Sequence, residues 1–80
     1  MDPHEVLEAL AQGHYQVTLH AGQRMSQRNV SHADIRCCGK NGKALRQGDG
    51  KIKVWGFDLD GEALSLICVE EGGVLIVTVF

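Results

Sequence analysis

The residues with the clearest chemical potential are His20, Arg24 and Arg28. They are spaced four residues apart, so on a helix they form one ridge about 12 Å long at 1.5 Å per residue. An imidazole can act as a general acid or base near neutral pH, and two guanidinium groups one turn apart suit a phosphate or a carboxylate. We therefore predict a catalytic site on this ridge. The alternatives are a histidine that packs against a neighbouring backbone group and a solvated helix face with surface ion pairs.

A second set of residues could contact a nucleic acid: Arg46, Lys51, Lys53 and Trp55. The two lysines and the tryptophan alternate along one predicted strand, so their side chains point to the same face. Arg46 lies near them in the sequence and would extend the same patch. A tryptophan can stack on a base, although a core or half-buried tryptophan is commoner, and each lysine taken alone is more often an exposed sheet residue.

The charge is distributed unevenly along the chain. All eight lysine and arginine residues lie within residues 24–53, which contain only two acids, so this segment carries +6 in a chain of net charge −2. This asymmetry indicates a basic surface for a polyanion or an acidic partner. The alternative is a set of solvated faces that cluster by chance.

The remaining side chains give little support to other site classes. The cysteines and histidines show no C-x-x-C or H-x-x-x-H spacing, and no glycine-rich phosphate loop is present. Three cysteines, two of them adjacent, favour a reducing compartment. No signal-peptide core opens the chain, and the longest apolar run is too short to span a bilayer. We therefore expect a cytoplasmic protein that uses no metal or other cofactor and does not engage a membrane.

Local sequence signals predict the elements that must position these residues. Helices are expected from a cap at Asp2 to a stop at Gly13, over residues 20–28 up to Asn29, and from a cap at Ser31 to a stop within residues 39–42. Strands are expected over residues 14–19, 51–57, 62–69 and 74–80, with residues 43–47 as a possible edge strand.

This order predicts a single α+β domain over residues 1–80. The economical arrangement is an antiparallel sheet of four strands, or five if residues 43–47 pair, with the N-terminal helix and the two short helices on one face. The order is helix, strand, helix, helix, the uncertain strand, then three strands. We expect the first strand to join the sheet beside the last strand or at its edge.

The pattern around the ridge resembles a known family. The run Thr18-Leu19-His20-Ala21-x-x-Arg24-Met25-x-x-Arg28-x-Val30-Ser31-x-x-Asp34-Ile35, with a glycine-containing hairpin and the final Ile76-Val77-Thr78-Val79, resembles a bacterial family of small proteins, number 4258 in the series of domains of unknown function. The resemblance covers most of the chain from His14 onward. It implies a fold like that of RelE/ParE toxins, and hence a toxin-like ribonuclease, or a relative of one, partnered with an antitoxin.

Two functional hypotheses follow. The first is an RNA-binding protein or a metal-independent endoribonuclease, in which His20 acts as acid or base while Arg24 and Arg28 hold the phosphate. The second is a non-catalytic interaction module that pairs with a partner or a second copy through its apolar C-terminal strand.

Overall fold

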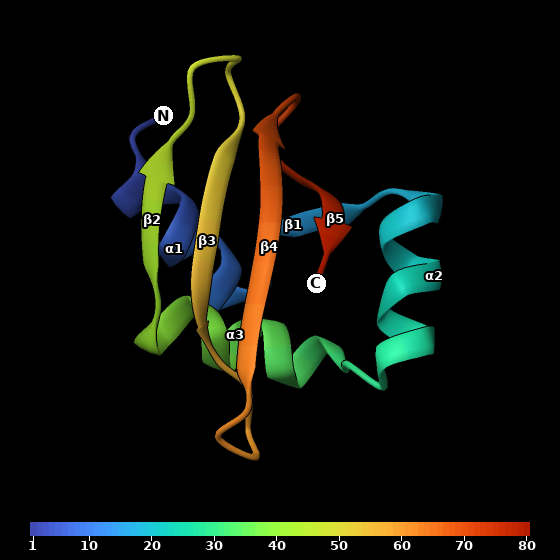
Figure 1. Cartoon of the computed structure of the whole chain (residues 1–80). Helices are drawn as coiled ribbons and strands as arrows, with labels where there is room; N and C mark the ends of the chain where they lie inside the picture. Colours follow the sequence, from blue (N-terminus) through green and yellow to red (C-terminus); the bar gives the residue numbers. More distant parts are fainter.

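The computed structural model describes all 80 residues. The chain forms one sheet with helices packed against it (Figure 1). The elements follow the predicted order: α1 (Pro3–Gln12), β1 (Tyr15–Val17), α2 (Leu19–Arg28), α3 (His32–Asn41), β2 (Lys43–Arg46), β3 (Ile52–Phe57), β4 (Ala63–Glu70) and β5 (Val74–Val79). Helices α1 and α3 lie behind the sheet, and α2 stands beside β1 and β5. None of the three helices combines the length and apolar character needed to span a bilayer. The α+β class and the element order are confirmed.

The sheet has five strands in the order β1-β5-β4-β3-β2, so β2 is indeed an edge strand. The β2–β3, β3–β4 and β4–β5 pairs are antiparallel, as expected for short connections, but β1 is parallel to β5. The sheet is therefore mixed: the predicted antiparallel pairing is confirmed for β2 to β5, and β1 is the exception. Strands β1 and β5 are separated in the chain by α2, α3 and strands β2 to β4, which is long enough for a parallel pair, since such a pair needs a crossover of about a dozen residues or more.

The C-terminal strand lies inside the sheet rather than at its end. Strand β5 is hydrogen-bonded to β1 on one side and to β4 on the other, as predicted for its neighbour β1. Its apolar sequence is that of an interior strand. Strand β1 pairs with β5 only at Val74, Leu75 and Ile76, so edge-to-edge pairing of a partner with the rest of β5 stays a prediction.

The predicted helix ends are largely confirmed because short-range hydrogen bonds determine them. Asp2 with Glu5 and Ser31 with Asp34 form reciprocal capping boxes at α1 and α3. The residue after α2, Asn29, has the left-handed conformation at φ 57° that ends a helix.

The predicted strand over residues 14–19 is too long. Strand β1 ends at Val17, because the Thr18 hydroxyl accepts a hydrogen bond from the Ala21 N–H at 3.0 Å and so caps α2. Leu19 is then the first residue of α2, and 81% of its surface is exposed. Leu19 therefore does not belong to the strand that was predicted over residues 14–19.

The core lies between the inner face of the sheet and the three helices. It consists of 14 buried residues: Val6, Leu10, Ala21, Met25, Ile35, Cys38, Ile52, Val54, Leu64, Leu66, Cys68, Val74, Ile76 and Val79. Strands β3, β4 and β5 supply eight of these 14 residues, and all of them except Val79 follow the alternation of a strand. Their neighbours therefore point to the opposite face of the sheet.

Gly39 sets the distance between the two helices behind the sheet. It lies inside α3 rather than at its end, and a Cβ there would be 2.6 Å from the Ala11 backbone nitrogen and 2.9 Å from the Leu10 Cβ. Only glycine leaves room for α1 at this point.

We predict opposite effects for two helical Gly→Ala substitutions. Gly39→Ala should destabilise the fold by about 1–3 kcal/mol, because α1 or α3 must move. Gly22→Ala in α2 is the matched control: its nearest neighbour would be Val17 Cγ1 at 4.0 Å, and it should stabilise the fold by up to about 1 kcal/mol. Urea unfolding of both variants checks this, and equal changes in the free energy of unfolding would contradict the close helix contact.

The Asp34 carboxylate joins α3 to the β3–β4 hairpin. It accepts hydrogen bonds from the Ser31 N–H at 2.8 Å, the Ser31 hydroxyl at 3.0 Å and the Leu59 N–H at 3.1 Å. The backbone hydrogen bonds from Ser31 and Leu59 lower the pKa of this buried carboxyl. Asp34 is therefore charged at neutral pH.

A lowered folded-state pKa stabilises the fold above the unfolded pKa of about 4, and this stabilisation is lost as the pH falls through the folded-state value. We predict that Asp34→Asn lowers the free energy of unfolding at neutral pH by roughly 1–3 kcal/mol. It should also flatten the fall in stability on acidification. Chemical denaturation over a pH series tests this, with Asp60→Asn in the exposed hairpin as control. A wild type and Asp34→Asn variant that lose stability in parallel on acidification would refute it.

Candidate nucleic-acid interface

No helix covers the outer face of the sheet (Figure 1). Aromatic and basic side chains of β3 lie on this face. On β3, Lys53, Trp55 and Phe57 alternate with the inward Ile52 and Val54. Trp55 is 39% exposed and Phe57 is 53% exposed. The prediction that Trp55 shares a face with Lys53 is confirmed.

Strand pairing places Lys43, Ser65 and Phe80 in one row with Trp55. Directly paired residues share a face of the sheet, and a single row runs Lys43, Trp55, Ser65, Phe80 across β2, β3, β4 and the chain end. The Phe80 N–H and C=O both bond to Ser65 at 2.8 Å, so this residue continues the ladder beyond β5. We call the surface formed by Lys43, Lys53, Trp55, Phe57 and Phe80 the aromatic face.

Lysine side chains lie close to the rings of the aromatic face. Lys53 Nζ is 5.8 Å from the centre of the Phe80 ring, within the range of a cation–π contact. A shallow hollow between β2, β3 and β4 is lined by Leu45, Gln47, Lys53, Trp55 and Ser65. The small Ser65 side chain between Trp55 and Phe80 leaves the two rings separated, so each presents its surface to solvent.

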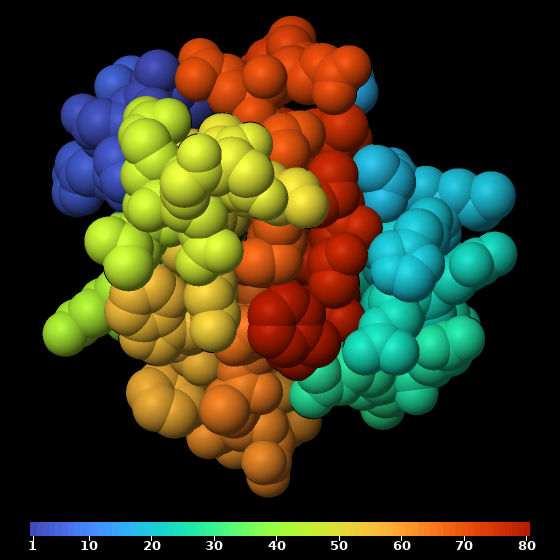
Figure 2. Space-filling model, turned by 45° about the horizontal axis from the view of Figure 1, so that its top comes forward, coloured from blue at the N-terminus to red at the C-terminus, as the bar shows by residue number.

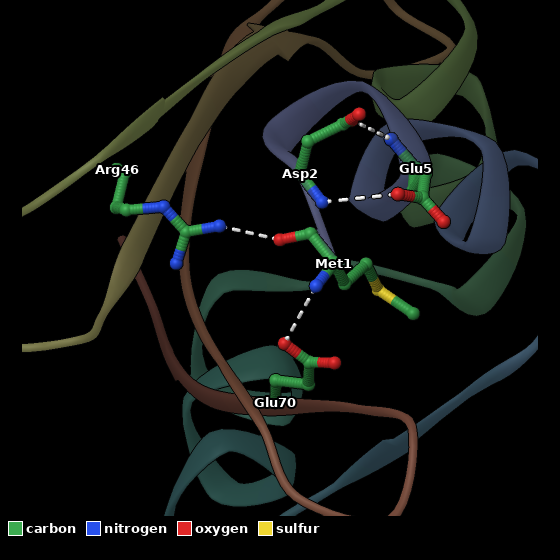
Figure 3. Close-up of polar contacts among 5 residues, drawn as sticks. All are labelled: Met1, Asp2, Glu5, Arg46 and Glu70. Atoms are coloured by element: carbon green, nitrogen blue, oxygen red, sulfur yellow. Dashed lines mark hydrogen bonds and ion pairs between the residues drawn. The ribbon is translucent and has the colours of Figure 1, made fainter.

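The aromatic face contains no carboxylate. Glu70 is the only acidic residue within the five strands. Its carboxylate binds the Met1 amino group at 3.1 Å (Figure 3). The face is therefore locally positive although the chain has a net charge of −2.

Asn41 fixes the backbone of Phe57. Its amide nitrogen donates to the Phe57 carbonyl at 3.0 Å, and its amide oxygen accepts from the Phe57 N–H at 2.9 Å. Gly56 makes this possible, since a Cβ there would be 2.5 Å from the Asn41 oxygen. The end of α3 thus holds the most exposed ring of the aromatic face in place.

Two of the predicted RNA contacts lie apart from this face. Arg46 pairs with the inward-facing Ile52, and its guanidinium donates to the Met1 carbonyl, so it points toward the N-terminus (Figure 3). Lys51 lies in the β2–β3 turn with its ammonium 3.5 Å from the Asp49 carboxylate. The Lys51 backbone N–H lowers the pKa of Asp49 by hydrogen bonding, so the acid is charged and offsets the lysine.

The α2 ridge, formed by His20, Arg24 and Arg28, is present as predicted on one flank of α2. His20 and Arg28 are exposed and take part in no hydrogen bond or ion pair with the protein. Arg24 is half-buried, and its Nε donates to the Val79 carbonyl at 3.2 Å. No titratable side chain orients His20, so its catalytic role stays a prediction.

The two buried cysteines, Cys38 and Cys68, are not reactive thiols. Burial raises the pKa of the Cys38 thiol to about 11 and that of Cys68 to about 12, so both are protonated at neutral pH. No three His, Cys, Asp or Glu side chains lie close enough together to hold a metal ion.

Sequence reasoning named Lys53 and Trp55 but missed three members of the aromatic face. Phe57 could have been found, because it continues the alternation of Trp55 by two residues. Lys43 required the register of β2 on β3, and Phe80 required the pairing of the chain end with Ser65. The last two depend on non-local pairing.

Of the comparisons with known proteins, only the one with family models gave a match. Neither the curated proteins nor the solved structures gave a match to this chain. Residues 17–80 match a family model described as a domain of unknown function, DUF4258. The match contains both the α2 ridge and the aromatic face, and leaves out α1. Because it spans well over half of the chain, the protein belongs to the DUF4258 family.

Proposed function

We propose that this protein binds single-stranded RNA in the cytoplasm, and that the aromatic face is its binding surface. The observation that carries the proposal is the set of three exposed aromatic rings with two lysines on a sheet face without a carboxylate. Base stacking on aromatic side chains of an open sheet is a common way to hold single-stranded RNA.

The spacing of the rings suits unpaired bases. Trp55 and Phe80 lie two strands apart in one row, which corresponds to roughly 10 Å at the usual strand spacing. A single strand can splay its bases to reach both rings, whereas a duplex keeps its base faces stacked inside. The proposal therefore favours single-stranded over double-stranded RNA.

The lysines supply the attraction to the phosphate backbone. Lys43 ends the row that contains Trp55, and Lys53 lies beside Phe80. Neither forms an ion pair within the protein. Their charges are available to phosphates, so binding should weaken as the salt concentration rises.

The resemblance to RelE/ParE toxins suggests a narrower hypothesis. In it, the protein is a metal-independent endoribonuclease with an antitoxin partner, and His20 is the acid or base. The exposed imidazole is accessible to a substrate, which supports the hypothesis, but a general base is normally held by a second group. We therefore propose RNA binding as the function, and His20→Ala, assayed for cleavage and binding separately, as the test of catalysis.

We predict that Trp55→Ala and Phe57→Ala each weaken binding of a labelled oligouridylate by about 5- to 150-fold, which corresponds to the usual 1–3 kcal/mol per stacked base. Fluorescence anisotropy of the labelled RNA measures the affinity. Trp55 is the only tryptophan, so its intrinsic fluorescence in the wild type should also change on binding.

Leu59→Ala is the matched control, because Leu59 is 64% exposed but lies in the β3–β4 hairpin. It should bind as the wild type does. A double-stranded RNA of the same length should bind more weakly. Equal affinities of the Trp55→Ala, Phe57→Ala and Leu59→Ala variants for the RNA, or no binding by the wild type at low salt, would contradict the proposal.

A further inference from the structure

The α2 ridge borders the aromatic face at the end of β5. Arg24 binds the carbonyl of Val79, the residue that precedes Phe80. Figure 2 shows α2, in cyan to green, beside the red C-terminal segment, with β3 on the other side of that segment. The two surfaces are therefore neighbours, and Phe80 lies where they meet.

The orientation of α2 turns the ridge toward this border. Ala21 and Met25 point into the core. The flank of α2 with Leu19, Gly22 and Gln23 lines a hollow beside β1. The ridge lies on the other flank, because residues spaced four apart share one side of a helix and its central member, Arg24, reaches β5.

The cations of the ridge are not neutralised by the protein. Other basic side chains do face a carboxylate: Lys51 Nζ lies 3.5 Å from Asp49 Oδ2, and His4 Nε2 lies 3.0 Å from Glu8 Oε1. No carboxylate forms an ion pair with Arg24 or Arg28. The hydrogen bond from Arg24 to Val79 uses Nε alone, which holds the guanidinium beside the chain end without neutralising its charge.

We propose that the α2 ridge binds phosphates of the same RNA strand whose bases stack on the aromatic face. The strand crosses Phe80 and continues along α2, with Arg24 and Arg28 about 6 Å apart along the helix axis. Arginine suits this role because its planar fork donates two parallel hydrogen bonds to a phosphate. The inference rests on the proposed RNA binding and adds the path of the backbone.

Arg28 has an alternative, structural role: as a cation in the last turn of α2 it interacts favourably with the helix dipole and so stabilises the helix. Lys40 also lies in the last turn of its helix, one residue before the end of α3, and is exposed. Lys40→Gln is therefore a matched control for Arg28→Gln, because each removes one positive charge from the end of a ten-residue helix.

The experiment measures the affinity for an oligouridylate of about ten nucleotides, a typical site size, at several salt concentrations. A phosphate contact on a single strand contributes about 0.7 to the slope of log affinity against log salt. We expect Arg28→Gln to reduce this slope by about 0.7 and Arg28→Lys to keep it. Lys40→Gln should leave the slope unchanged, and Trp55→Ala should weaken binding without changing the slope.

The outcomes separate the two proposals. If Trp55→Ala weakens binding while Arg28→Gln and Lys40→Gln have the same slope as the wild type, the ridge does not contact phosphates and RNA binding by the aromatic face stands. If the wild type binds no RNA, the proposed function and the ridge contact both fail. Equal losses of slope in Arg28→Gln and Lys40→Gln would show a general charge effect and also overturn the inference.

Discussion

The close contact between α1 and α3 at Gly39 is the constraint on which the rest of the structure depends. It allows two helices to lie side by side on one face of the sheet and bury the inward residues of β3, β4 and β5. An 80-residue chain can complete only one modest core, so no element remains to cover the other face. The one-sided arrangement therefore determines which side chains meet solvent.

An uncovered sheet face would ordinarily be polar, since antiparallel sheets usually place polar residues on the solvated side. Here it exposes Trp55, Phe57 and Phe80 with lysines beside them. Exposed aromatic clusters on a small protein usually mark an interaction site. Specific hydrogen bonds hold two of these aromatic residues in place: Asn41 binds the backbone of Phe57, and Arg24 binds the backbone next to Phe80. Glu70, the only acid within the strands, binds the Met1 amino group, and this is why we propose a polyanion as the partner of the face.

The parts of the structure that local chemistry determines could be predicted from the sequence. The cap at Ser31 depends on residues a turn away, and the outward direction of Trp55 depends on alternation within one strand. The alternation of residues 14–19 gave a wrong end for the first strand, because the Thr18 hydroxyl caps α2 and the helix begins at the next residue. Arg46 points to the inner side of the sheet because it pairs with Ile52, and Phe80 joins the outer face because it pairs with Ser65. A single sequence does not specify this register between strands.

The most direct test of the account is a map of backbone amide chemical shifts as a single-stranded oligouridylate is added to the labelled protein. The account predicts the largest changes on the outer-face residues of β3, at Ser65 and Phe80, and along the ridge side of α2. Changes confined to α1 and α3, which cover the opposite face of the sheet, would contradict it.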